Sequence, residues 1–218
     1  MEEEDKQTQE EIIEEPDPWY KGPIKYIILV FLLLIIILWV PSYYVKLDPS
    51  PSRIPSISEV LLSNVVLENK TIKIEKQGDY AAMINPSDPV IKQTADKIST
   101  IACDGDKICQ SKAIYYFVRD NIEYVADPLG FEYVEEPKEV LVTNAGDCES
   151  GAILMASMLE AIGIRTELVF IPSHAFVRAK IDGVSKRYNI GDWVYLEERM
   201  RVASSRAESY RRIAWELR

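Results

Sequence analysis

Residues 146–177 read GDCESGAILMASMLEAIGIRTELVFIPSHAFV, and this stretch predicts the fold. The segment after Cys148 is apolar on nearly every side until Gly163, which is typical of a helix in the centre of a domain. Three β-prone runs follow, at 166–171, at 175–181 and within 187–196. Helices followed by an antiparallel sheet indicate an α+β domain, in which the central buried helix packs on the sheet.

Two more helices are expected upstream of this stretch. Asp88-Pro89 combines an N-cap residue with proline at the first helical position, so a helix should run from there to about Ile101. After a short polar turn, apolar residues recur at helical spacing as far as Val125. The chain between this second helix and residue 142 is expected to be mostly loop, because Pro137 lies inside it.

The run at residues 26–45 contains no charged side chain. A run of about 20 apolar residues matches the thickness of the hydrocarbon core of a bilayer. Tryptophan and tyrosine residues near both ends are typical of interfacial belts. A transmembrane helix over residues 21–45 is therefore predicted, with the lipid bilayer as a partner. A cleaved signal peptide fits less well, because the apolar run is long and no small-residue cleavage site follows Val40.

Composition divides the rest of the chain into four segments: 1–20, 46–58, 59–200 and 201–218. The first is acidic and is predicted to be a disordered tail. The second is rich in proline and serine, which indicates an extended linker. The third contains the α+β domain, with a small hairpin expected at 64–68 and 71–75. The last predicts a basic amphipathic helix, either docked on the domain or touching lipid headgroups.

The three cysteines bear on the cellular compartment. Cys103 and Cys109 flank a short polar turn that a disulfide can span, whereas Cys148 stands alone. A disulfide indicates an oxidising compartment, and two reduced cysteines are the alternative. Basic residues nearly balance across the apolar run, so the cysteines decide the expected orientation. The N-terminus is predicted to be cytoplasmic and the domain extracytoplasmic, which the glycosylation sequon at residues 69–71 also favours.

Charge and composition exclude some classes of partner. The net charge of −10 argues against DNA or RNA, because phosphate binding needs clustered lysine and arginine. His174 is the single histidine and there is no second cysteine pair, so a zinc site is not expected. No cofactor or metal is predicted.

Cys148 is the candidate nucleophile. It follows a glycine-containing loop and begins the central helix, where unpaired N–H groups and the positive end of the helix dipole favour a thiolate. The same N–H groups are suited to bind an oxyanion during acyl transfer. The neighbouring carboxylates of Asp147 and Glu149 act in the opposite direction and raise the pKa of the thiol. Activation would therefore depend on a nearby imidazole.

His174 is the residue that can supply that imidazole. It begins the second β-prone run, so its ring would project from a sheet edge that the start of the central helix can meet. Asp192 and Glu197, on or beside the third run, are candidates to orient the ring, as in other catalytic triads. The alternative is that the cysteine is a small core residue and the histidine has a structural role.

The same sequence also resembles the core of the transglutaminase-like superfamily, a papain-like cysteine fold. Gly-Asp-Cys, a buried helix ending near Ile-Gly-Ile, a strand, and His-Ala-aromatic-Val follow one another as in that family. The upstream segments KAIYYFVRDNIEYV, residues 112–125, and EEPKEVL, residues 135–141, are similar to those that precede the family's nucleophile. The resemblance covers about residues 88–197 and looks closest to archaeal, membrane-tethered members.

The resemblance implies roles for individual residues. Cys148 would be the nucleophile and His174 the general base. The third residue of the family is the aspartate of a Trp-x-x-Leu-Asp pattern, and residues 193–197 read WVYLE, so Glu197 stands in its place. Asp192, just before the tryptophan, is the other candidate for this role.

The implied function is that of a membrane-anchored cysteine hydrolase or acyltransferase. It would act on amide bonds of a peptide or protein substrate through a thioester, foremost as a peptidase or amidase. Transfer of the acyl group to a lysine amine, which gives a crosslink, is also compatible with the resemblance. The alternative function is a catalytically degraded domain that binds a peptide or protein.

Overall fold

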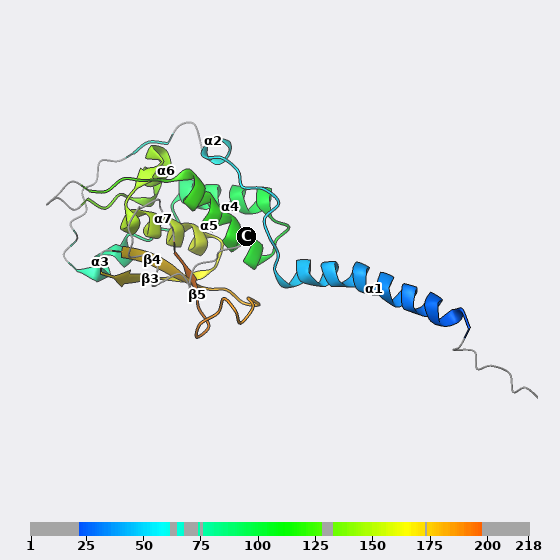
Figure 1. Ribbon diagram of the computed structural model, residues 1–218. Coiled ribbons are helices and arrows are strands. Elements are labelled where there is room, and N and C mark those ends of the chain that lie inside the picture. The colour runs from blue at the N-terminus through cyan, green and yellow to red at the C-terminus, as the bar shows by residue number, and fades with distance from the viewer. Residues whose placement is uncertain are drawn as a thin grey trace, which may run out of the picture. The chain divides into compact units, whose positions relative to one another are not determined.

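The computed structural model describes residues 22–61, 65–67, 74, 76–127, 133–172 and 174–197 (Figure 1). Two compact units are present, Met1–Tyr44 and Val45–Arg218. The predicted acidic tail and C-terminal helix lie outside the described residues, as does most of the predicted hairpin.

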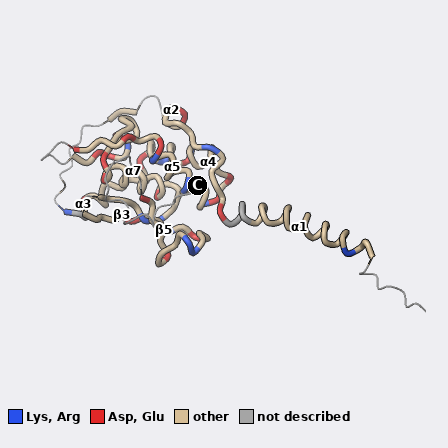
Figure 2. Tube along the Cα trace, in the orientation of Figure 1, with Lys and Arg blue, Asp and Glu red and all other residues tan. Residues whose placement is uncertain are grey.

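Helix α1, Ile24–Leu47, is the long apolar helix that the sequence predicts. Its segment Ile24–Pro41 is long and apolar enough to cross a membrane by length and composition. Figure 2 shows α1 almost free of charged residues along its length. The rings of Trp39 and Tyr43 stack with their centroids 5.7 Å apart.

Within its described residues, the second unit contains helices α2 to α7 and strands β1 to β5. Two short helices, α2 at Ile57–Val60 and α3 at Gln77–Ala82, precede the main ones. Helix α4, Pro89–Ala102, begins where the Asp88-Pro89 signal places it, because the Asp88 carboxylate accepts hydrogen bonds from the N–H groups of Val90 (2.8 Å) and Ile91 (3.3 Å).

Helix α5 ends earlier than the sequence predicts. It spans Lys107–Asn121 and ends four residues before Val125, the predicted end. Residues Glu123–Tyr124 form strand β1 instead, which pairs in parallel with β2, Ala145–Gly146. The backbone N–H of Glu123 donates to the carbonyl of Asn144 (2.8 Å), and that of Val125 donates to Gly146 (3.0 Å). Tertiary pairing therefore overrides the helical periodicity at this point.

Helix α6 spans Pro137–Thr143, where the sequence predicts a loop, so that prediction is wrong. Proline occupies the start of the helix, where its missing N–H costs nothing and its fixed φ is already helical. Asn144 then ends the helix in the left-handed conformation, with φ of 58°. The proline thus begins a helix and does not interrupt one.

Helix α7, Cys148–Ala161, is central, and residues 150–159 are all buried. It contacts α4, α5 and α6, and it also contacts the antiparallel sheet (Figure 1). The strands of that sheet lie in the order β3–β4–β5, with the bounds Arg165–Ile171, His174–Lys180 and Val194–Leu196. The predicted α+β class, with a central helix packed on an antiparallel sheet, is confirmed.

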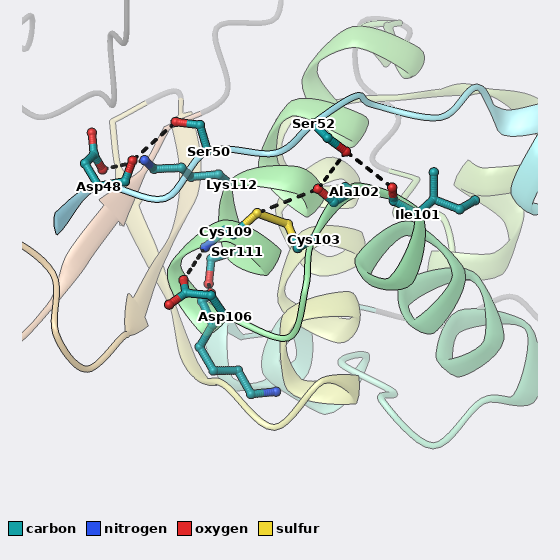
Figure 3. Close-up of a disulfide and its surroundings, with 11 residues drawn as sticks. Asp48, Ser50, Ser52, Ile101, Ala102, Cys103, Asp106, Cys109, Ser111 and Lys112 are labelled. Atoms are coloured by element: carbon teal, nitrogen blue, oxygen red, sulfur yellow. Dashed lines mark hydrogen bonds and ion pairs between the residues drawn. A yellow bond between two sulfur atoms is a disulfide. The ribbon is translucent and has the colours of Figure 1, made fainter. Parts of the chain in front are cut away.

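The linker that follows α1 is bound to the domain near the corner between α4 and α5 (Figure 3). Ser52 donates from its backbone N–H (2.9 Å) and its hydroxyl (3.1 Å) to the carbonyl of Ala102. Asp48 pairs with Lys112, whose side chain is fully buried, at 2.5 Å. A Cys103–Cys109 disulfide joins the end of α4 to the first turn of α5. At least this part of the predicted spacer is therefore fixed to the domain.

Candidate active site

Cys148 is the first residue of α7 and is half-buried. Asp147 is the N-cap, and its carboxylate accepts a hydrogen bond from the Ser150 N–H at 2.8 Å. Gly146, before it, packs tightly, because a Cβ there would lie 3.3 Å from the Cβ of Ser150 and 3.4 Å from Val140. Pairing of this loop with β1 and close packing against α6 and α7 hold the thiol in place.

Two of the backbone amides of this first turn are available to a ligand. The Asp147 side chain takes the Ser150 N–H, and its carbonyl takes that of Gly151. Within the described residues, no hydrogen bond occupies the N–H groups of Cys148 and Glu149. These two donors lie at the positive end of a buried helix, the environment that stabilises a developing oxyanion.

His174 begins β4, and Glu197 directly follows β5. Antiparallel pairing of β4 with β5 brings the two side chains together, and the distance from His174 Nε2 to Glu197 Oε1 is 3.5 Å. This is an ion-pair distance, longer than a typical hydrogen bond. The Tyr115 hydroxyl donates to the Glu197 carbonyl at 2.9 Å and so helps to fix its backbone.

Asp192, the other candidate for the third role, lies before β5 in a turn. It has a positive φ of 67° and precedes Trp193, which forms a bridge with Ile190. Among the described residues, Asp192 makes no ion pair with His174. The structure therefore places Glu197, and not Asp192, beside the imidazole.

Cys148 is linked to the start of β4 by a backbone contact. The backbone N–H of Ala175, the residue after His174, acts on the Cys148 sulfur and lowers the pKa of the thiol. The first turn of α7 and the first residues of β4 are thus adjacent. This contact brings together two segments that are 26 residues apart in the sequence.

The electrostatics at Cys148 oppose a resting thiolate. Burial is the largest effect, and the hydrogen bond to Glu149 follows; together they raise the pKa of Cys148 to about 12. The thiol donates to Glu149 Oε2 at 2.8 Å. The sequence predicts that the neighbouring carboxylates raise the pKa of the thiol, and in the structure their effect adds to that of burial. Cys148 is therefore a neutral thiol at rest.

A carboxyl–hydroxyl network lies beneath the first turn of α7. Burial raises the pKa of Asp147 to about 7, with smaller contributions from the charges of Glu149 and Glu135, against the lowering effect of the hydrogen bonds with Ser150. The Ser150 hydroxyl donates to the Glu135 carboxylate and accepts from the Glu135 N–H at 3.0 Å. The pKa of Tyr124 is also raised, first by burial and second by its electrostatic interaction with Cys148.

Sequence reasoning did not identify Tyr124, Glu135 or Ser150 as site residues. Tyr124 is brought to the site by the β1–β2 pairing, and Glu135 by the segment that leads into α6. The similarity of residues 112–125 and 135–141 to the family's upstream segments was the sequence signal for this region. Two surface hollows lie elsewhere: one involves α2 and the end of α6, and the other involves the starts of α4 and α6. Neither is lined by Cys148, His174 or Glu197.

Comparisons with known proteins agree with the fold. A family model described as the transglutaminase-like superfamily matches residues 92–205, a little more than half of the chain. No curated protein matches the chain.

Two solved structures are similar to part of the chain. One is a candidate protease from Parabacteroides distasonis, with 20% identity, a TM-score of 0.39, and coverage of 49% of this chain and 22% of that one. The other is a candidate cysteine protease from Cytophaga hutchinsonii, also with 20% identity and a TM-score of 0.39, and with coverage of 58% and 44%. The aligned regions are less than half of each of those proteins, and neither similarity bears on the reaction of this chain.

Proposed function

The chain belongs to the transglutaminase-like superfamily, and on that premise we propose that it is a membrane-anchored cysteine enzyme that cleaves amide bonds through a thioester, as a peptidase or amidase. The observation that carries the proposal is the adjacency of three elements. Cys148 begins the buried helix, the residue after His174 contacts its sulfur, and Glu197 lies 3.5 Å from the imidazole. These are a nucleophile, a base and a group that orients the base.

The reaction begins from a neutral thiol, so His174 acts as a general base when the substrate is bound. As the sulfur attacks the carbonyl carbon, the thiol proton passes to the imidazole and negative charge develops on the carbonyl oxygen. The N–H groups of Cys148 and Glu149 are positioned to stabilise that charge. Glu197 stabilises the imidazolium and fixes the orientation of the ring, as the acid of a triad does.

Collapse of the tetrahedral intermediate breaks the C–N bond. The imidazolium proton goes to the leaving amine, and the acyl group remains on Cys148 as a thioester. Water then attacks the thioester and gives up a proton to His174; the thiolate leaves and takes that proton back. The products are a carboxylic acid and an amine. If a lysine amine attacks in place of water, the product is an isopeptide crosslink.

The experiment monitors both outcomes of the thioester. The full chain in a non-ionic detergent is incubated with a digest of casein in H₂¹⁸O, with and without a biotinylated alkylamine. Hydrolysis predicts new C-termini that carry ¹⁸O, and amine transfer predicts biotinylated peptides. Both signals should disappear in Cys148→Ala and His174→Ala. Persistence of the signals in Cys148→Ala would rule out the proposed reaction, as would their absence from the wild-type chain together with an unreactive thiol.

A non-catalytic binding domain is the second candidate, and a specific observation favours it. The thiol donates to Glu149 and its pKa is raised to about 12, which suits an inert cysteine as well as a resting one. If this function is correct, Cys148→Ala leaves the binding of a captured peptide unchanged and no ¹⁸O enters any product.

We also propose that the domain faces an extracytoplasmic, oxidising compartment, with the N-terminus cytoplasmic. The Cys103–Cys109 disulfide and the apolar helix α1 support this orientation. Protease treatment of sealed, right-side-out vesicles should degrade the domain and spare an N-terminal epitope tag. Degradation of the tag with protection of the domain would reverse the assignment.

A further inference from the structure

The direction of the Cys148 S–H bond raises a specific problem for catalysis. A thiol has a single proton, and here it is donated to Glu149 Oε2 at 2.8 Å. His174 Nε2 faces Glu197, so Nδ1 is the ring nitrogen left to accept a proton from the sulfur. It can do so only after the S–H bond has turned away from Glu149. A group that occupies the Glu149 carboxylate would favour this turn of the S–H bond toward the imidazole.

The described part of the chain does not supply that group. Glu149, Asp147, Glu135 and Asp127 form no ion pair with a lysine or arginine there. Lys138, on α6, pairs with Glu136 at 3.7 Å. The charges of Asp147 and Glu149 both act on the thiol, and those of Asp147, Glu149 and Asp127 act on Tyr124. Among the residues that the structure describes, no lysine or arginine compensates the negative field at the thiol.

A cation on the substrate has the chemistry to release the thiol. A lysine ammonium or arginine guanidinium offers the Glu149 carboxylate a stronger donor and an opposite charge, whereas the thiol is a weak, uncharged donor. Once the carboxylate is taken up, the thiol can turn to the imidazole. Anionic substrates would be repelled by the same field.

We propose that Glu149 is a specificity-determining residue that exchanges its hydrogen bond with the Cys148 thiol for one with a lysine or arginine side chain of the substrate. The enzyme would then act on basic peptides, with the basic side chain next to the scissile amide. This inference rests on the proposed function for the role of Cys148. It adds the class of substrate and a reason for a carboxylate beside a nucleophile.

Matched alkylating probes test this idea without knowledge of the natural substrate. Cys148 is the single cysteine outside the disulfide, so intact mass reports its alkylation alone. The probes are chloroacetyl-lysine amide and chloroacetyl-norleucine amide, which have side chains of similar length and differ in charge. Each rate on the full chain in neutral detergent is divided by the rate with glutathione.

For the wild-type chain, the lysine probe should react about tenfold faster than the norleucine probe, as expected for an ion pair near the protein surface. In Glu149→Gln the two corrected rates should agree within about twofold, and the norleucine probe should react several-fold faster than with the wild-type chain. Glu149→Asp should keep the lysine preference, because it retains the charge. The control is Glu160→Gln near the end of the same helix, which should behave as the wild type.

A lysine preference below about threefold in the wild-type chain overturns the proposal, as does a preference that survives in Glu149→Gln. Circular dichroism of each variant identifies loss of fold, and Glu149→Asp provides the test if Glu149→Gln does not fold. The His174→Ala variant separates this proposal from the proposed function. It should slow both probes and leave their ratio unchanged; if neither rate falls, the catalytic pair is wrong, and the ratio still reports on Glu149.

Discussion

Asp147→Asn is expected to stabilise the protein at neutral and alkaline pH. Asp147 is only 7% exposed, and burial raises the pKa of its carboxyl from 3.8 to about 7. The folded state therefore holds its proton to a higher pH than the unfolded state does. Stability falls as the pH rises from the unfolded to the folded pKa, and the loss is complete above pH 7. Asparagine carries no charge, and its amide oxygen can still accept the Ser150 N–H.

The magnitude follows from the size of the shift. Each unit of pKa corresponds to about 1.4 kcal/mol, so the full shift sets an upper limit of about 4 kcal/mol. About 1 kcal/mol of this is already lost at pH 4.5, which leaves about 3 kcal/mol between pH 4.5 and pH 8. Since Glu149 and Glu135 contribute to the shift, we expect the stability difference between variant and wild type to widen by about 2 kcal/mol over that interval.

Urea denaturation of the full chain in non-ionic detergent, followed by tryptophan fluorescence, measures this difference at both pH values. The control is Asp96→Asn, because Asp96 is exposed and pairs with Lys92 at 2.5 Å. Its effect should be small and should destabilise at pH 8. If the free energies of unfolding of Asp147→Asn and wild type differ by the same amount at pH 4.5 and pH 8, burial does not hold the proton on Asp147. A variant that is less stable than wild type at pH 8 would show the same.

Three further sets of substitutions test how the site and the linker are held in place. Asp48→Asn should lower the free energy of unfolding by about 2 kcal/mol, because it removes a carboxylate that pairs with the buried Lys112 ammonium, and Lys112→Met in the same chain should recover much of the loss. An equal loss from Asp48→Asn in the wild-type chain and in the Lys112→Met chain would contradict this. Replacing Cys103 and Cys109 by serine should cost about 2 kcal/mol from the loop that the disulfide closes, measured by urea denaturation against the reduced wild type, which should show the same loss. Gly146→Ala should cost about 1–3 kcal/mol, because its Cβ would lie 3.3 Å from the Cβ of Ser150; an unchanged melting temperature would show that the loop is not tightly packed.

Sequence reasoning succeeded where local and global signals agree. Asp88-Pro89 marks the start of α4 through its own backbone hydrogen bonds. The continuous apolar character of residues 150–159 matches a helix that is buried on all sides. The sequence places His174 at the start of a strand next to the helix that begins at Cys148, and the Ala175 contact is consistent with that placement.

The errors arose where tertiary contacts decide. Helical spacing continues through Ile122 to Val125, but backbone hydrogen bonds to residues 144 and 146 hold residues 123–124 in a strand. Pro137 by itself indicates a loop, because proline is compatible with a helix only in the first turn, and the start of α6 carries no side-chain cap that would mark that turn. Glu135 and Ser150 meet through the fold alone, at a separation of 15 residues.

Several sequence predictions remain predictions. The resemblance to archaeal, membrane-tethered members, the orientation of the apolar helix and the catalytic roles of the site residues belong to this group. The balance between the helix dipole and the neighbouring carboxylates could be posed from the sequence. Whether Cys148 rests as a thiol or a thiolate depends on its burial and on its hydrogen bond to Glu149, and only the structure shows these.

Acylation of Cys148 by an activated ester is the sharpest test of the proposed pair of Cys148 and His174. The full chain is mixed with p-nitrophenyl acetate near neutral pH, and intact mass is recorded over time with and without hydroxylamine. We predict a single acetyl adduct on Cys148 that hydroxylamine removes. The adduct should be absent in Cys148→Ala, and its formation should be slowed about 100-fold or more in His174→Ala, as expected for the loss of a general base. Acylation of Cys148 at the same rate in wild type and His174→Ala would contradict a catalytic role for the histidine.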